Sequence, residues 1–164
     1  MPLTPLIAPA IPKVVFDCNV FLQALVNPNG PAGRCKQLVD RGEVELYVSE
    51  DVLREVADVL SRPRHRKLMP SLTLTVVEAL LADLRLKAIC LQNVPEEYRF
   101  ERDPKDACYL NLAIVANARF IVSRDNDLLD LMKLTDETAR VFQRRYPLLK
   151  IITPPDLLAA VETL

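Results

Sequence analysis

Four carboxylates in this chain stand where an apolar run ends or where a helix is predicted to begin. They are Asp17, Glu55, Asp106 and Asp125. Asp17 directly follows the apolar run Val14–Phe16, and Asp125 follows Phe120–Val122 after two intervening residues. Carboxylates gathered at one point repel one another unless a hard cation such as Mg²⁺ or Mn²⁺ lies between them. If the fold brings these four together, the chemistry they indicate is that of a bound divalent metal ion.

Each of these acids also has a structural explanation. Asp17 could cap a helix, because Asp is a preferred N-cap residue. Glu55 falls at the margin of the apolar stripe predicted for the helix 50–61, where a Glu is usually a solvated flank. The run Asp103-Pro104-Lys105-Asp106 is a good helix start, so the helix dipole explains part of Asp106. A purely structural role therefore remains an alternative at each position.

Asp106 and Asp125 have features that capping does not fully explain. The helix that begins near Asp106 is apolar on all sides. The Asp106 carboxylate therefore lies near a buried face and needs a partner. A metal ion would be one partner, and a cation chosen from Arg102, Lys105 or Arg124 would be the structural alternative. The run 123–127 places a hydroxyl and two acids, Asp125 and Asp127, in one turn. Capping one helix does not need both acids.

Short β-like runs alternate with longer helical runs along the chain, which predicts an α/β fold with a mainly parallel sheet of about five strands sandwiched by helices. In such a sheet, ligands bind at the carboxyl ends of the strands, where Asp17 and Asp125 would lie. The predicted strands are 13–17, 44–49, 88–91, 119–123 and 149–153. The predicted helices are 20–26, 33–41, 50–61, 73–87, 104–117, 127–133, 135–146 and 155–162.

Composition limits the class of protein. The 164 residues carry a net charge of −1 and are 50% hydrophobic and 26% charged, which is ordinary for a globular protein. We expect one domain over residues 13–164, preceded by a proline-rich extension over residues 1–12. No apolar run approaches the roughly 20 residues of a membrane span. The four cysteines form no C-x-x-C pair, so we expect reduced, mostly buried thiols in a cytoplasmic protein. No P-loop or G-x-G-x-x-G motif is present.

Four segments resemble the successive motifs of PIN-domain nucleases, above all the PIN-family toxin components of bacterial toxin–antitoxin systems. They are Val14–Val20, Ser49–Val56, Asp103–Asp106 and Ile121–Leu129. The end of the chain, Ile152–Leu158, also resembles the usual ending of the family. One motif would be weak evidence, whereas four in the family's order at plausible spacing are strong.

The resemblance implies an endoribonuclease that hydrolyses RNA phosphodiester bonds with Mg²⁺ or Mn²⁺. The metal-binding and catalytic acids carry over to Asp17, Glu55, Asp106 and Asp125, with Asp127 as a fifth metal ligand and with Asn19 and Ser123 supporting the site. Cys18 departs from the commoner Thr beside the first acid, which alters hydrogen bonding around the site without removing a ligand. The resemblance also implies an antitoxin protein as a partner and, less directly, a homodimer.

The chemistry agrees with this inventory, because phosphodiester hydrolysis needs a positioned water, a Lewis acid and neutralisation of developing charge. The single His of the chain makes metal-free His chemistry improbable. Arg62, Arg64, Arg66 and Lys67 could contact RNA phosphates, or they could form a solvated loop. A second cluster, Arg140, Arg144 and Arg145, has the same two interpretations.

Two other functions remain as alternatives. A haloacid-dehalogenase-like phosphatase also ends its first strand in an Asp nucleophile, but it normally has a second Asp two residues later, where this chain has Asn19. A catalytically idle PIN-like protein that acts as a binding or regulatory partner is the other. Every expected acid is present, so no residue favours the idle protein directly.

Overall fold

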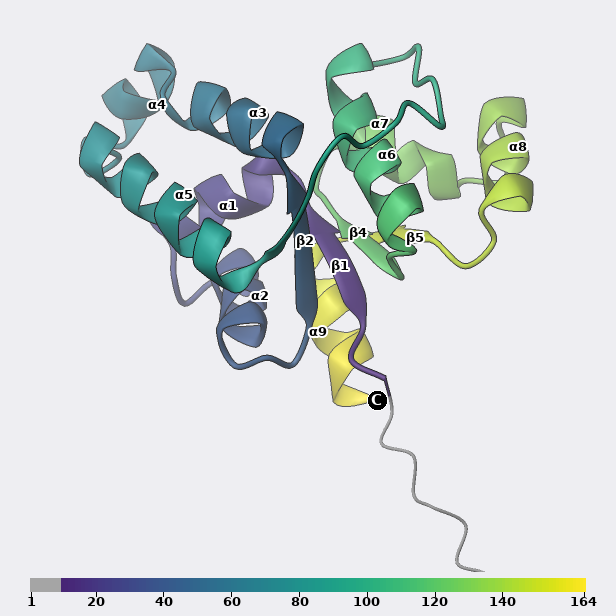
Figure 1. The fold of residues 1–164 in the computed structure, drawn as a ribbon, viewed down its shortest axis with the longest axis horizontal. Coiled ribbons are helices and arrows are strands. Elements are labelled where there is room, and N and C mark those ends of the chain that lie inside the picture. Colours follow the sequence, from purple (N-terminus) through teal and green to yellow (C-terminus); the bar gives the residue numbers. More distant parts are fainter. Residues whose placement is uncertain (1–9) are drawn as a thin grey trace, which may run out of the picture.

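Five parallel strands form a single sheet in the computed structural model, which describes residues 10–164 (Figure 1). The strand order is β3-β2-β1-β4-β5, and every neighbouring pair is parallel. The strands are β1 (Lys13–Phe16), β2 (Glu45–Ser49), β3 (Ile89–Leu91), β4 (Phe120–Val122) and β5 (Lys150–Ile152). The predicted α/β class with a parallel central sheet is confirmed. Residues 1–9 of the predicted N-terminal extension lie outside the described residues.

The sheet forms because its central strands are apolar on both faces. Val14, Val15, Ile121 and Val122 have no exposed surface, and Phe16 is 1% exposed. In the sequence, parallel strands that helices cover on both sides have such continuous apolar runs. Burying one of these side chains stabilises the fold by about 1.5–3 kcal/mol. Strands β1 and β4 therefore belong to the buried core of the sheet.

Helices cover both faces of the sheet. Figure 1 shows α6 in front of the strands and α9 behind them. The helix α6 packs against β1, β2 and β4, whereas α9 packs against α2 and β4. The helices are α1 (Cys18–Val26), α2 (Pro31–Asp40), α3 (Glu50–Leu60), α4 (Pro63–Leu68), α5 (Leu74–Lys87), α6 (Ala107–Ala116), α7 (Asn126–Leu129), α8 (Glu137–Arg145) and α9 (Pro154–Glu162), with 3₁₀ turns η1 (Pro104–Asp106) and η2 (Asp130–Met132).

Two predicted helices differ in detail, and one helix was not predicted. The predicted helix 104–117 begins with the 3₁₀ turn η1, and the predicted helix 127–133 divides into α7 and η2. The basic strip at residues 62–67, for which a solvated loop was one interpretation, forms most of α4. Pro63 occupies the first turn of α4, where its fixed φ favours a helix and its missing N–H costs nothing.

The strand order reverses direction beside β1. The chain runs from β1 to β2 and β3 on one side, then returns to place β4 and β5 on the other side of β1. Ligands of open α/β sheets bind outside the carboxyl ends of the strands at such a switch point. The residues that follow β1 and β4 are therefore those that the fold places best for function.

The described residues also bear on the thiols and on membranes. All four cysteines are free, but only Cys35 is buried; Cys18, Cys90 and Cys108 are half-buried, so the prediction of mostly buried thiols was wrong. Cys18 begins α1, Cys108 lies in the first turn of α6, and Cys90 lies in the edge strand β3. Between residues 10 and 164, no helix combines the length and the apolar character needed to cross a bilayer.

Candidate metal centre

The pairing of β1 with β4 brings Asp17 and Ser123 together. Phe16 pairs with Val122 in the parallel register, so the next residues, Asp17 and Ser123, leave the sheet side by side. The main-chain N–H of Asp17 continues the ladder by donating to the carbonyl of Val122 at 3.1 Å. Both side chains are buried, and the Ser123 hydroxyl donates to the Asp17 carboxylate. Two residues that are 106 apart in sequence thus form one polar unit at the switch point.

Asp17 is both a helix cap and a buried acid. Its carboxylate accepts a hydrogen bond from the main-chain N–H of Val20 at 3.1 Å, so it caps α1 as the structural explanation predicted. It is also only 2% exposed. Burial raises the pKa of this carboxyl to about 6, against the lowering effect of Ser123 and of the N–H groups of Val20 and Asn19, and the Asp125 charge raises it further. A cap on the surface would not have this environment.

Asp106 lies in a still less favourable environment for a carboxylate. Burial raises its pKa to about 8, and the charges of Asp125, Asp103 and Asp17 add to the effect. Among the described residues, its buried Oδ2 has no hydrogen-bond partner. The structural alternative required Arg102, Lys105 or Arg124 beside Asp106, but within residues 10–164 none of the three forms an ion pair with it, and Arg102 pairs with Asp127 and Asp130. Among the described residues, no group therefore supplies the partner that the buried oxygen of Asp106 needs.

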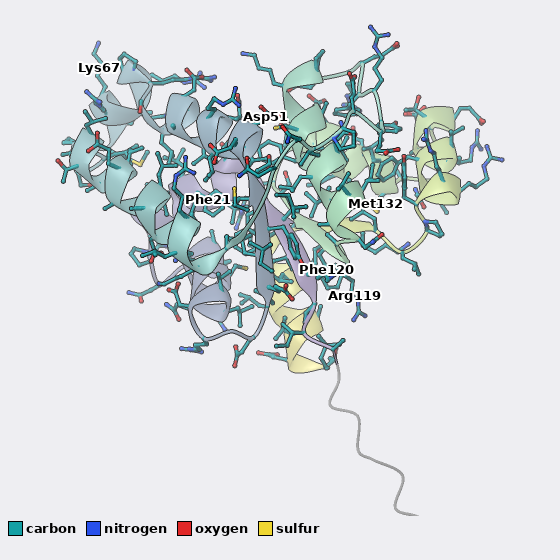
Figure 2. The ribbon with its side chains drawn as sticks, in the orientation of Figure 1. Phe21, Asp51, Lys67, Arg119, Phe120 and Met132 are labelled. Atoms are coloured by element: carbon teal, nitrogen blue, oxygen red, sulfur yellow. The ribbon has the colours of Figure 1, made fainter. Side chains whose placement is uncertain are left out.

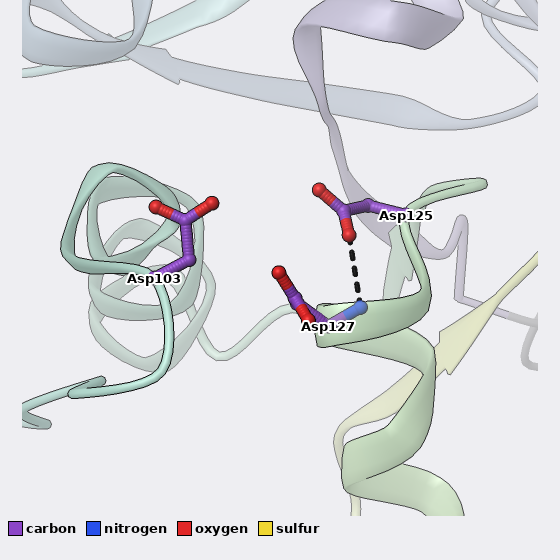
Figure 3. Close-up of side chains that lie close together, drawn as sticks. All are labelled: Asp103, Asp125 and Asp127. Carbon is purple, nitrogen blue, oxygen red and sulfur yellow. Dashed lines mark hydrogen bonds between the residues drawn. The ribbon is translucent and has the colours of Figure 1, made fainter.

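A third acidic group lies at the same edge, where a carboxylate oxygen from each of Asp103, Asp125 and Asp127 lies within 4.8 Å of the others (Figure 3). Asp125 caps α7 by accepting from the N–H of Asp127 at 2.8 Å, and its own N–H donates to the Ser123 hydroxyl at 2.9 Å. Two oxygens on one Mg²⁺ lie at most about 4.2 Å apart, because each Mg–O bond is about 2.1 Å. A small inward movement would make this group a bidentate or tridentate site.

Sequence reasoning did not include Asp103 among the site residues, because its role as a cap was sufficient to explain it. Its carboxylate does accept from the N–H of Lys105 at 3.1 Å. The same side chain faces Asp125 and Asp127 across the gap between the residues before α6 and α7 (Figure 3). The only sequence signal was its place in the motif that also holds Asp106.

Arg102, beside Asp103, neutralises part of this acidic edge. Its Nε lies 2.6 Å from Asp127 and its Nη2 lies 2.9 Å from Asp130. Asp130 also pairs with Lys133 at 2.6 Å. Asp127, predicted as a fifth metal ligand, is thus paired with a guanidinium in the described structure.

Glu55 approaches the same region from α3. It is half-buried, while its helix buries the apolar side chains Val52, Leu53 and Val56. Burial raises the pKa of the Cys18 thiol to about 12, and the charges of Asp17, Glu55 and Asp106 contribute to this rise. The pKa of the Cys108 thiol is likewise raised to about 12 by burial and then by Glu55 and Asp106. The charge of Glu55 therefore raises the pKa of the same two thiols as the charge of Asp106 does.

These observations fit a divalent cation. Carboxylate oxygens of Asp103, Asp125 and Asp127 lie within 4.8 Å of one another, and the buried oxygen of Asp106 lacks a partner among the described residues. Deprotonating Asp17 and Asp106 is unfavourable without a positive charge, as their raised pKa values of about 6 and about 8 indicate. Hard carboxylate oxygens are the ligands that Mg²⁺ and Mn²⁺ prefer.

The predicted basic strip forms a helix at the far end of α3. Figure 2 labels Asp51 near the start of α3 and Lys67 at the tip of the region formed by α4 and α5. Arg62 pairs with Asp58 at 3.1 Å, and His65 hydrogen-bonds the Val59 carbonyl at 2.7 Å, which fixes α4 on α3. Over residues 10–164, Arg64, Arg66 and Lys67 are exposed and form no ion pair. The second basic cluster on α8 differs, since Arg140 and Arg144 pair with Glu137.

Comparison with known proteins places the chain in a family. The model of the PIN domain matches residues 13–127. The uncharacterised protein MJ1680 of Methanocaldococcus jannaschii is 31% identical over 119 residues, which are 73% of this chain and 74% of that protein. The chain belongs to the PIN-domain family of nucleases.

Solved structures share the fold at low sequence identity. PAE2754 from Pyrobaculum aerophilum superposes with a TM-score of 0.55 and 14% identity, covering 94% of this chain and 91% of that one. VapBC2 from Rickettsia felis, solved bound to a DNA fragment from its promoter, gives a TM-score of 0.50 and 12% identity, covering 86% of this chain and 98% of that one. This family membership leaves the phosphatase alternative without support.

Proposed function

We propose that this protein is a Mg²⁺- or Mn²⁺-dependent endoribonuclease that hydrolyses RNA phosphodiester bonds and serves as the toxin of a toxin–antitoxin pair. The observation that carries the proposal is the electrostatic coupling of Asp17, Asp106 and Asp125 at the switch point of the sheet. Burial is the main cause that raises the pKa of Asp17 and of Asp106, and the charge of Asp125 raises both further. A site that destabilises its own carboxylates in the absence of a cation is expected where a cation is needed.

We assign the catalytic and metal-holding roles to Asp17, Glu55, Asp106 and Asp125, with Asp127 as a further ligand. The ion, when bound, supplies a Lewis acid for the phosphate and a bound water of lowered pKa. Ser123 orients Asp17 by donating to it, and fixes the turn of Asp125 by accepting from its N–H. Asn19 supports the site through its main-chain N–H, which lowers the pKa of Asp17. These contacts hold the two acids ready for a metal.

RNA would reach from the acids to α4. Glu55 and Arg62 are seven residues apart, which is about 10 Å along a helix. Arg64, Arg66 and Lys67 follow on α4 and have no acidic partners within residues 10–164 to compete with phosphates. Arg62, already paired with Asp58, would contribute less. Such contacts increase affinity without selecting a sequence.

The partner of this nuclease is proposed to be an antitoxin whose segment covers the acidic edge with Arg or Lys side chains. Support comes from the motif resemblance to PIN-family toxins and from the acidic character of the edge. We further propose that the protein forms a homodimer and that its nuclease domain spans residues 13–164. We also propose a cytoplasmic location, with which the four free cysteines are consistent. Copurification with the product of the neighbouring gene tests the antitoxin, and loss of all cleavage on its addition is the expected result.

The central experiment compares RNA with a small phosphate ester as substrates. Purified protein is incubated with Mg²⁺, Mn²⁺ or EDTA, and RNA fragments and p-nitrophenol release are measured in parallel. We expect metal-dependent RNA cleavage and no release of p-nitrophenol. Ester hydrolysis without RNA cleavage would favour the phosphatase, and inactivity on both substrates would favour the catalytically idle protein.

A further inference from the structure

A pocket of about 200 Å³ adjoins the acidic edge. One wall is the chain segment 98–102, and the opposite walls come from α7, η2 and the start of α8. Arg102 and Asp127 belong both to this pocket and to the acidic edge. Drug-sized ligands need roughly 300–1,000 Å³. The pocket therefore suits a single ring system.

The segment that forms the wall is held rigidly. Asn111 of α6 is 6% exposed, and its carbonyl oxygen accepts from the main-chain N–H groups of Glu97 and Tyr98 at 2.7 and 2.8 Å. Its amide group donates to the carbonyls of Tyr98 and Ala107 at 3.0 and 2.9 Å. The Tyr98 ring packs edge-on against Phe142 of α8 with 5.1 Å between centroids. The pocket is consequently preformed.

The polar groups of the pocket are only partly used. A guanidinium has five N–H donors, and Arg102 directs one to Asp127 and one to Asp130. Arg102 is half exposed, so its remaining donors are accessible. Asp136 accepts from the N–H of Thr138 through Oδ1, and over residues 10–164 its Oδ2 makes no hydrogen bond. Arg99 lines the same pocket and is exposed.

We propose that this pocket binds the guanine base of the nucleotide next to the scissile phosphate, with Arg102 contacting that phosphate. The inference rests on the proposed nuclease function and adds the substrate's base to it. The half-buried Tyr98 supplies most of the apolar wall for the ring, because Phe100 and Leu131 are each only 3% exposed. Acids outnumber cations in the lining, which favours a neutral base over a phosphate inside the pocket.

Guanine matches the polar lining better than the other bases do. It presents two acceptors, O6 and N7, on one edge and an amino donor on another. Arg99 can donate to the acceptors, and the free oxygen of Asp136 can accept from the donor. Uracil offers the Asp136 carboxylate a single N3–H donor, whereas guanine offers two adjacent donors, N1–H and the amino group. A paired base contact discriminates by a factor of about ten or more.

The test measures binding without cleavage. Full-length protein in EDTA is titrated with GMP, UMP and ribose 5-phosphate by calorimetry or NMR. Asp136→Asn removes the charge while Asn still caps α8, and Glu137→Gln is the matched control just outside the pocket. We expect GMP to bind at least about tenfold more tightly than UMP. Asp136→Asn should abolish that preference, Glu137→Gln should retain it, and Arg102→Gln should weaken GMP and UMP by the same factor.

Three results would overturn the inference: equal affinity for GMP and UMP, a preference that survives Asp136→Asn, or no saturable binding of GMP. Cleavage mapping on an RNA with all sequence contexts gives a second readout, in which sites flanked by guanine should dominate. Failure here is distinguishable from failure of the nuclease proposal. Metal-dependent RNA cleavage without guanine preference refutes only the pocket, whereas guanine binding without RNA cleavage refutes only the nuclease.

Discussion

Replacing Asp17 with Asn separates the two roles of this residue, the cap of α1 and the buried acid. Asn caps a helix about as well as Asp, so the hydrogen bond from Val20 can be retained. The Ser123 hydroxyl donates to the other carboxylate oxygen, which becomes the amide nitrogen in Asn, so Ser123 must accept from that nitrogen instead of donating. What the substitution removes is the negative charge in a group that is 2% exposed.

The stabilisation follows from the pKa of Asp17. Folding raises it from 3.8 to about 6, so the folded state favours the protonated acid. In the absence of metal, the favourable contribution of this group is complete below pH 3.8 and is lost as the pH rises through about 6. At about 1.4 kcal/mol per pKa unit, ionised Asp17 costs the fold about 3 kcal/mol at neutral pH. We expect Asp17→Asn to recover about 1–3 kcal/mol, because the amide group fits less well than a protonated acid.

The assay is unfolding in EDTA at pH 7.5 and pH 4, with wild type and variant side by side. The expected gain at pH 7.5 corresponds to a rise of roughly 2–10 °C in Tm, and it should nearly vanish at pH 4. Asp136→Asn is the matched control for stability, since Asp136 is an exposed N-cap of α8 whose change should leave Tm unaltered. Adding Mg²⁺ should raise the Tm of wild type and affect Asp17→Asn far less.

The same variant should lose RNA cleavage with Mg²⁺, since it lacks a charged ligand for the Lewis acid. Full activity would mean that Asp17 is only a cap. A variant that is less stable than wild type in EDTA at pH 7.5 would refute the claim that the buried charge destabilises the metal-free fold.

Three further predictions concern Ser123 beside the acids, Glu55 on α3 and the basic residues of α4. Ser123→Ala should lower the free energy of unfolding by about 1–3 kcal/mol, because it removes a buried hydroxyl shared by two acids; an unchanged urea midpoint would contradict this. Glu55→Gln should reduce metal-dependent cleavage at least about a hundredfold without lowering Tm, while Asp58→Asn on the same helix should not reduce cleavage. Exchanging Arg66 and Lys67 for Glu should weaken RNA binding and make its log–log salt dependence shallower by about 0.7 for each phosphate that is no longer neutralised, with kcat unchanged; an unaltered salt slope would remove α4 from the RNA path.

The amino-acid sequence by itself was sufficient for the class of fold. Apolar runs such as Val14–Phe16 and Phe120–Val122 are buried on both faces, as is typical of parallel strands under two helical layers. Turn and cap residues located most helices to within a few positions. The helix α4 was missed because its sequence is basic and has no apolar stripe, so its ends depend on the contacts of Arg62 and His65 with α3.

The positions of Asp17 and Asp125 at the carboxyl edge were also predictable, because each follows a strand and parallel strands end at one edge. Which side chains then meet was decided only by the tertiary structure. Sequence reasoning offered Arg102 as a partner of Asp106, but Arg102 pairs with Asp127 and Asp130, and a buried oxygen of Asp106 has no partner among the described residues. It explained Asp103 as a cap, whereas the segment before α6 also brings this carboxylate to Asp125 and Asp127. Spacing along a chain fixes the face on which a residue lies, but the partner of a long or mobile side chain depends on segments that only packing brings within a few ångströms.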